Sequence, residues 1–282
     1  MIRVNNKALA LGSFDGLHKG HLAVLSSAKT HSERTAVVFD IPPAMTGGQR
    51  ELLLSVDEKH SILNQMGFTV ETLDFAAVKN IEPIAFLETL KEKYSPAKIC
   101  CGFNYRFGKN GSGTQEILKE FCLQNGIELS VTPEVVLSGD RISSSRIRSI
   151  IKTGDMETAA LLLGRDFSLR GTVTHGDMRG RTINFPTANF PYPEDLVMAK
   201  HGVYAATCFI AGEEYKAVCY VGKRPSYALP TPIVETYIID FSGDLYGKEL
   251  KVNLKKYLRD EIRFDSLSEL KNQLKKDIIS AK

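Results

Sequence analysis

The chain has 282 residues, enough for one large domain or two ordinary ones, and its 43% hydrophobic and 24% charged residues fit a folded globular protein. The net charge of +3 is weak for a dedicated nucleic-acid binder, and no apolar run approaches the roughly 18 residues of a membrane span. The five cysteines are odd in number and form no CxxC pair, which fits small apolar side chains in a reducing cytoplasm. The first residues have too short an apolar run for a signal peptide, so we expect a cytoplasmic protein without membrane or nucleic-acid partners.

Strand-like and helix-like segments alternate in the first half of the chain. Short apolar runs, often stopped by glycine, predict strands over 8–14, 35–40, 68–75, 97–103 and 127–135, and longer mixed segments predict helices over 21–31, 56–67, 83–94 and 114–126. This alternation predicts a Rossmann-like α/β domain, in which helices cover both faces of a parallel sheet. Ligands bind such sheets at the carboxyl ends of the strands.

The pattern changes in the second half. Two short helices are expected over 145–154 and 155–164, and glycine turns then separate strand-like runs over 169–176, 202–212, 215–222, 234–241 and 248–258. This spacing predicts an antiparallel sheet or small β-barrel, and an amphipathic segment over 266–278 predicts a terminal helix. We therefore expect two domains, 1–164 and 165–282.

The stretch GSFDGLHKGH, Gly12–His21, lies where the first strand gives way to the first helix. Its glycines permit tight turns and close approach of a ligand, and a helix that begins near His21 offers an N-terminus that favours anions. His18 and His21 have a spacing that suits one helical face, but no third metal ligand lies nearby. The pattern favours a phosphate cradle, and the alternative is a glycine turn with incidental histidines.

A second basic stretch, DRISSSRIRS, covers residues 140–149. Its arginines Arg141, Arg146 and Arg148 stand beside three serine hydroxyls, and arginine is suited to bidentate phosphate contacts. The alternative is a serine-capped basic helix that faces solvent. Together the two stretches resemble the nucleotidylyltransferase superfamily, whose marks are an HxGH motif and a later ISSTxxR motif. Here Ser145 replaces the usual threonine and keeps the hydroxyl.

Further motifs narrow this resemblance. The loop GFNYRFGKNGSG, Gly102–Gly113, is similar to the GxNFRFG loop beside the flavin site of prokaryotic FAD synthetases. The second half contains GDMRGRTINFPTAN, then VETYIIDF and FSGDLYGKE, in the order and spacing of riboflavin kinases. The whole chain therefore resembles the bacterial bifunctional riboflavin kinase/FMN adenylyltransferase family.

Glu235 is the unusual residue of the VETYIIDF segment. Period two places it on one strand face with Tyr237 and Ile239, where a carboxylate is costly unless it is exposed or has a partner. Alternation alone leaves open an outward-facing residue of the barrel. The resemblance implies instead that Glu235 is the general base of riboflavin phosphorylation.

The resemblance implies that the first domain joins ATP to FMN and releases FAD and pyrophosphate. It gives catalytic roles to His18, His21 and Arg148, and places Asn104 and Arg106 at the flavin. ATP and phosphate contacts would come from Gly12, Phe14, Gly20, Arg141, Ser143, Ser144 and Ser145.

In the second domain the resemblance implies ATP-dependent phosphorylation of riboflavin to FMN. Thr187 and Asn189 would bind Mg²⁺, with Asn189 also at the ATP phosphates, and the loop with Gly176, Arg179 and Gly180 would wrap those phosphates. The expected partners are therefore the small molecules riboflavin, FMN and ATP, with Mg²⁺ as the cofactor. We expect a monomer or a weak homo-oligomer.

The sequence departs from the family patterns at two turns. The usual FxPHP reads FDIPP here, so that Ile41 replaces the first proline and Pro42 replaces the histidine. The usual NIGxRPT reads YVGKRPS, with Tyr220 for the asparagine and Ser226 for the threonine. These changes leave two alternatives to the bifunctional enzyme, a kinase-only relative with weakened adenylylation and a flavin-binding regulator.

Overall fold

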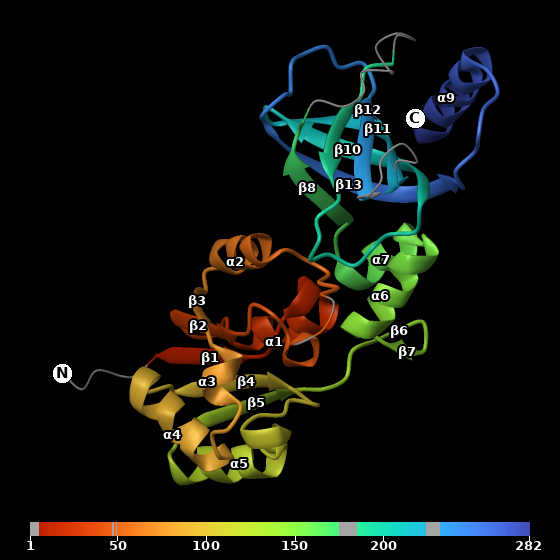
Figure 1. Cartoon of the computed structure of the whole chain (residues 1–282). Coiled ribbons are helices and arrows are strands. Elements are labelled where there is room, and N and C mark those ends of the chain that lie inside the picture. Colours follow the sequence, from red (N-terminus) through yellow and green to blue (C-terminus); the bar gives the residue numbers. More distant parts are fainter. Residues whose placement is uncertain (1–5, 47, 49, 175–184, 224–231) are drawn as a thin grey trace. The chain divides into compact units, whose positions relative to one another are not determined.

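The computed structural model describes residues 6–46, 48, 50–174, 185–223 and 232–282, and the chain divides into two compact units, Met1–Ser144 and Ser145–Lys282 (Figure 1). The first unit is built on a five-stranded sheet in the order β3-β2-β1-β4-β5, and every neighbouring pair is parallel. The strands are β1 (Lys7–Leu11), β2 (Glu33–Val38), β3 (Thr69–Thr72), β4 (Lys98–Gly102) and β5 (Glu128–Thr132). The predicted α/β domain with a parallel sheet is confirmed.

Helices cover both faces of this sheet because its central strands are apolar on both sides. Ala8 and Ala10 of β1 pack into one core cluster, and Leu9 and Leu11 into the other. The first cluster is completed by side chains of α1 (Lys19–Ser27) and α2 (Val56–Gln65), and the second by α4 (Pro83–Tyr94) and α5 (Gln115–Gln124).

Local capping moves several element boundaries away from the sequence prediction. The strand predicted over 68–75 ends at Thr72, because Asp74 caps the short helix α3 (Phe75–Val78) by accepting a hydrogen bond from the Ala76 N–H. The first helix begins at Lys19 rather than at His21. A small hairpin of β6 (Val136–Leu137) and β7 (Asp140–Arg141) was not predicted.

The second unit holds two helices, α6 (Ser144–Thr153) and α7 (Met156–Leu163), and an antiparallel sheet in the order β8-β13-β10-β11-β12-β9. The strands are β8 (Phe167–Thr172), β9 (Ala188–Pro191), β10 (Gly202–Ile210), β11 (Glu213–Lys223), β12 (Pro232–Ile238) and β13 (Glu249–Arg259). The Thr174 N–H donates to the Asn189 carbonyl at 2.8 Å, which joins the two ends of the sheet. The predicted antiparallel barrel is confirmed, and β9 is an additional strand.

Helix α9 (Leu267–Ala281) confirms the predicted terminal helix and is held by a buried ion pair. The Asp277 carboxylate is 3% exposed and accepts hydrogen bonds from Arg259 Nη2 at 2.7 Å and Nε at 3.0 Å. Gln273 Nε2 donates to the same carboxylate at 2.8 Å. The pair thus joins the helix to the end of β13.

Asp277→Ala is expected to lower the free energy of unfolding by about 3–5 kcal/mol, because it leaves the half-buried Arg259 charge without its partner. Urea unfolding, followed by circular dichroism, measures this loss. The matched control is Glu249→Ala, which breaks an exposed pair with Arg170 at 2.7 Å and is expected to cost about 1 kcal/mol or less. Equal losses in the two variants would contradict a special role for the buried pair.

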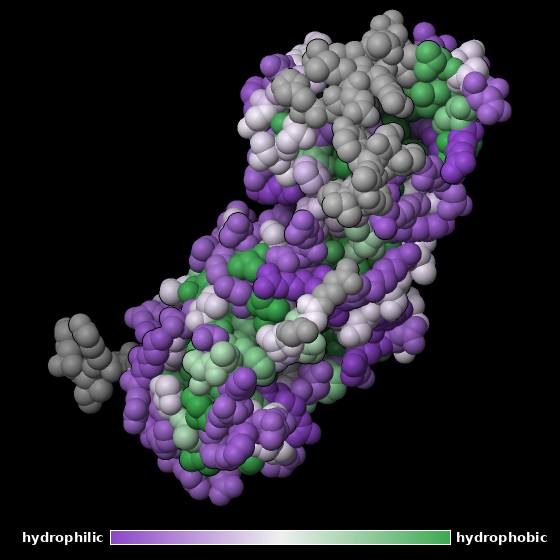
Figure 2. Space-filling model, in the orientation of Figure 1, coloured by the Kyte–Doolittle hydropathy of each residue, from purple (hydrophilic) through white to green (hydrophobic). Residues whose placement is uncertain are grey.

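The surface of the protein is mixed in hydropathy. On the face shown in Figure 2, hydrophilic residues cover most of the surface, and apolar residues emerge between them. Within the described ranges, no helix combines the length and the apolar character needed to cross a membrane. All five cysteines are free and buried, as expected for small apolar side chains.

Candidate functional site

The loop after β1 has a shape that packing imposes on it. Phe14, Gly16 and Leu17 have φ values of 49°, 79° and 43°, in the left-handed region that suits glycine but strains the other two residues. Phe14 and Leu17 are each only 1% exposed, so burial of their side chains holds this conformation. A Cβ at Gly16 would lie 2.7 Å from Leu53, which excludes larger residues there.

His18 and His21 meet at the N-terminus of α1. His18 is 5% exposed and caps the helix, since its Nδ1 accepts a hydrogen bond from the His21 N–H at 3.3 Å. The two imidazole rings stack with centroids 3.6 Å apart and an interplanar angle of 16°. The rings of Phe14 and His21 are nearly perpendicular, with centroids 5.5 Å apart. No group of three or more His, Cys, Asp or Glu side chains that could hold a metal occurs in the described part of the chain. The position of the pair at a helix N-terminus is one that favours anions.

The second motif begins beside the first within the same unit. Ser144 Oγ donates to the Asp15 carbonyl at 3.0 Å. A Cβ at Gly20 would lie 3.0 Å from the His18 ring and 4.0 Å from the Ile142 carbonyl, so both motifs approach this glycine. Gly12 follows β1 directly, and its N–H donates to the Val37 carbonyl at 3.3 Å. Ser145 and Arg148 belong to α6 of the second unit, and their contribution to this site stays a prediction, as does that of Ser143.

The loop predicted to bind flavin is closed on itself. Phe107 and Gly113 exchange backbone hydrogen bonds at 3.4 Å and 2.8 Å, and burial raises the pKa of the Tyr105 hydroxyl within the loop. Asn104 and Arg106 are exposed on it and available to a ligand. Arg141, on β7, lies over the ring of Phe103 at 5.8 Å from its centroid and 3.7 Å from a Glu134 oxygen.

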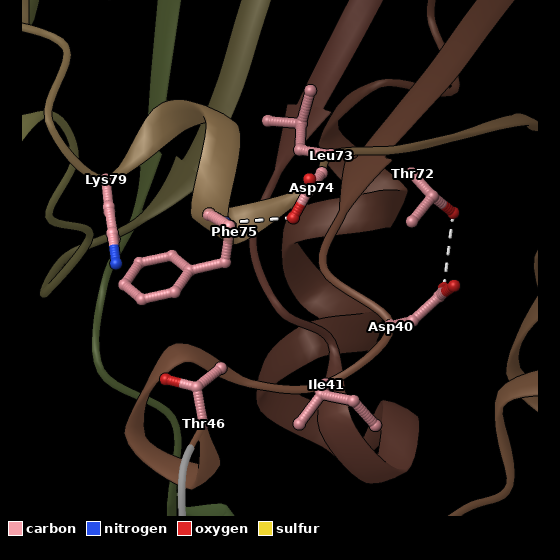
Figure 3. A pocket seen from close by; sticks show the side chains of 9 residues that line it. Asp40, Ile41, Thr46, Thr72, Leu73, Asp74, Phe75 and Lys79 are labelled. Carbon is pink, nitrogen blue, oxygen red and sulfur yellow. Dashed lines mark hydrogen bonds between the residues drawn. The ribbon is translucent and has the colours of Figure 1, made fainter.

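A cavity of about 660 Å³ opens beside the turn that carries the changed FxPHP motif. Figure 3 shows Phe75 and Lys79 on one side of this cavity and Ile41 and Thr46 on the other. Thr72, at the end of β3, donates to an Asp40 carboxylate oxygen at 3.2 Å (Figure 3). The turn after β2 therefore forms one rim of an open space at the carboxyl edge of the sheet.

Three residues predicted for the kinase meet in the second unit. Thr187 Oγ1 donates to Glu235 Oε1 at 2.8 Å, and Asn189 Nδ2 lies 3.4 Å from Thr187 Oγ1. Pairing of β9 with β12 places Asn189 directly opposite Glu235. Val234, Thr236 and Ile238 form the buried face of β12, so Glu235 lies with Tyr237 on the other, half-buried face; Ile239 follows the end of the strand.

The oxygens of this cluster fit a magnesium ion. Asn189 is 8% exposed, and its Oδ1 is buried without a hydrogen-bond partner among the residues that the structure describes. A buried acceptor of this kind is costly unless a ligand uses it, and amide, hydroxyl and carboxylate oxygens are the donors that Mg²⁺ prefers. Gly176, Arg179, Gly180 and Ser226, which the sequence also singles out, lie outside the described residues.

Comparison with known proteins identifies both halves of the chain. The FAD synthetase family model matches residues 2–146, and the riboflavin kinase family model matches residues 163–282. The chain belongs to the family of bifunctional riboflavin kinase/FMN adenylyltransferases. It is 33% identical to the Listeria monocytogenes member over 96% of this chain and 90% of the relative, and 31% identical to the Bacillus subtilis member over 95% and 89%.

A solved structure described as a macrolide-efflux protein from Streptococcus pneumoniae has the same fold throughout. Its TM-score is 0.89 at 30% identity, with 99% of this chain and 94% of that chain covered. The resemblance drawn from the motifs is thus confirmed at the level of the family and of the fold.

Tyr220 replaces the asparagine that this family usually has at the start of NIGxRPT. Pairing of β11 with β12 places Tyr220 directly opposite Glu235, a neighbour that the sequence alone did not predict. Burial raises the pKa of the Tyr220 hydroxyl, and the nearby Glu261 and Glu235 carboxylates raise it further. The departure from the family pattern thus stands beside the candidate base.

Lys59 is a second residue that the sequence analysis missed. It lies within α2, is 3% exposed, and donates from Nζ to the carbonyl oxygens of Phe39 and Asp40. Its position was detectable, because the residues three, four and seven places after Lys59 are the apolar Ile62, Leu63 and Met66, which is the spacing of one helical face.

Proposed function

We propose that the chain converts riboflavin to FAD in two steps, phosphorylation in the second domain and adenylylation in the first. The observation that carries this proposal is the joint presence of two distinct candidate sites, each inside the segment that matches the corresponding family model. Riboflavin, ATP and the intermediate FMN are its substrates.

In the phosphorylation step, the Glu235 carboxylate takes the proton of the ribityl 5′-hydroxyl while that oxygen attacks the γ-phosphorus of ATP, and ADP leaves. The 2.8 Å hydrogen bond from Thr187 orients this carboxylate. Thr187 and Asn189 are the residues that would hold Mg²⁺, which supplies neutralisation of phosphate charge when bound. Gly176, Arg179 and Gly180 are the residues that would bind the ATP phosphates.

In the adenylylation step, an FMN phosphate oxygen attacks the α-phosphorus of ATP and pyrophosphate leaves. No protein nucleophile takes part, so the chain contributes positioning and charge stabilisation. The stacked pair of His18 and His21, at the N-terminus of α1, stabilises the charge that develops on the phosphates. Ser144 and Arg148 bind the departing pyrophosphate, and Asn104 and Arg106 bind the flavin side.

We further propose that the catalytic domains are 1–164 and 165–282, since the two family matches leave only residues 147–162 between them. The enzyme acts in the cytoplasm as a monomer or weak homo-oligomer, without a nucleic-acid partner. Five free, buried cysteines support the reducing compartment.

The test is to incubate the protein with riboflavin, ATP and Mg²⁺ and to resolve FMN from FAD over time. FMN is expected to appear first and FAD to follow. FMN that accumulates without FAD, even when FMN is supplied as the substrate, would contradict the adenylylation and leave a kinase. A protein that binds flavin and makes neither product would contradict both steps.

A further inference from the structure

Asp15 and Lys59 are two buried charged residues that neither proposed reaction uses directly. Asp15 is 5% exposed and Lys59 is 3% exposed, although aspartate and lysine are rarely found inside proteins without partners. Burial of a charge costs free energy that only specific polar contacts offset. The contacts of the two residues therefore indicate what they hold in place.

The Lys59 ammonium binds the turn that follows β2. Its Nζ donates hydrogen bonds to the carbonyl oxygens of Phe39, at 2.6 Å, and of Asp40, at 3.1 Å. The next residue of α2, His60, has its Nε2 2.8 Å from Asp40 Oδ1, and Thr72 Oγ1 donates to the same carboxylate oxygen at 3.2 Å. The backbone and the side chain of Asp40 are thus both fixed, and the fixed turn forms a rim of the cavity shown in Figure 3.

Asp15 connects the same helix to the first motif. Its Oδ1 accepts a hydrogen bond from the Leu53 N–H at 3.0 Å, just before Ser55 caps α2. Its carbonyl accepts the hydrogen bond from Ser144 Oγ. Burial lowers the pKa of Lys59, and the negative charges of Asp40 and Asp15 raise it, so Asp15 also favours the charged lysine.

We propose that Lys59 is a positioning residue for adenylyl transfer, which holds the turn after β2 and the motif of His18 and His21 as one unit through α2. This role rests on the proposed adenylylation. The turn carries Pro42 where the family pattern has a histidine, and a proline side chain cannot donate a hydrogen bond to fix it. The position of the turn therefore depends on the contacts made at Phe39 and Asp40.

The test is Lys59→Met in the full chain, which keeps the length of the side chain and removes its charge. With FMN, ATP and Mg²⁺ in the assay, kcat for FAD formation is expected to fall about 10²-fold, because a displacement of the reacting groups by about 1 Å has a cost of this size. KM for FMN is expected to change by less than about threefold, because the loss lies in the transition state. Riboflavin phosphorylation, measured in the same preparation, is expected to stay unchanged.

Lys98→Met is the matched control. Lys98 is 7% exposed and pairs with Glu128 at 2.9 Å, but it is the first residue of β4, at the edge of the sheet opposite the turn after β2. This variant is expected to lower the unfolding midpoint and to leave kcat for FAD formation unchanged. A loss of kcat equal to that of Lys59→Met would mean that both changes act through stability, which overturns the proposal.

Asp15→Asn supplies a second variant, since asparagine keeps an oxygen for the Leu53 N–H and removes the charge. It is expected to lower kcat for FAD formation, and the double variant with Lys59→Met is expected to lose much less than the product of the single losses. The proposal is contradicted if the double variant loses kcat by the product of the two single losses, or if Asp15→Asn leaves kcat unchanged. If Lys59→Met does not fold, the kcat of Asp15→Asn alone decides the test. A wild-type protein that makes no FAD refutes the adenylylation itself, whereas active FAD formation by Lys59→Met refutes only the role of Lys59.

Discussion

Replacing Glu235 by glutamine is expected to lower the rate of riboflavin phosphorylation by about 10²–10⁴, the usual contribution of a general base. Glutamine keeps the size of the side chain and an oxygen that can accept the hydrogen bond from Thr187, which is 2.8 Å long in the wild-type protein. The glutamine amide cannot take the proton of the substrate hydroxyl. Initial rates of FMN formation at saturating riboflavin and ATP measure the loss. FMN-to-FAD conversion, assayed separately, is expected to stay at the wild-type rate.

Glu214→Gln is the matched control for this prediction, because Glu214 is exposed at the start of the neighbouring strand β11. Neither rate is expected to change in that variant. FMN formation by Glu235→Gln at the wild-type rate would exclude Glu235 as the base. Loss of both activities in a folded Glu235→Gln protein would instead contradict the assignment of the two reactions to separate domains.

Most of the fold was predictable because local and global signals agree in this chain. The strands of the first domain are short apolar runs and its helices carry clear polar faces, so alternation alone specified the parallel sheet. Strand β9 was missed because Pro186 precedes it and Pro191 ends it, and proline argues against a strand. Proline is tolerated in β9 because this strand is the last one in the order of the sheet.

The candidate sites were predictable only where the chemistry lies in contiguous motifs. His18 and His21 lie within one motif, and Thr187 and Asn189 within another, so their proximity follows from the local chain. The proximity of Tyr220 to Glu235 depends on the register between β11 and β12. That register is set by the pairing of the whole strands and not by either motif alone.

Lys59 illustrates a different limit of the sequence. A lysine within a helix usually faces solvent, and its burial follows from the position of two carbonyl groups at the end of a strand that is distant in sequence. Only the apolar spacing around it marked the residue as unusual. Contacts to the backbone of another segment leave no motif in the sequence. For this reason the sequence analysis identified the motif residues but not the positioning residue Lys59.

Replacing His21 by alanine is expected to impair the other reaction from the one that Glu235→Gln impairs. The kcat for FMN-to-FAD conversion is expected to fall by about 10²–10³, the usual loss when one group that stabilises a charged transition state is removed. The cap of α1 survives, because it uses the His21 N–H and the His18 ring, so the loss reports on the missing imidazole. His31→Ala is the matched control, since His31 contacts Thr30 in the turn before β2, outside the motif. Riboflavin phosphorylation, followed as FMN formation, is expected to be unchanged in both variants. An unchanged rate of FAD formation in His21→Ala would exclude this histidine from the site. A lower rate of FAD formation in His31→Ala would show that the effect is not specific to the motif.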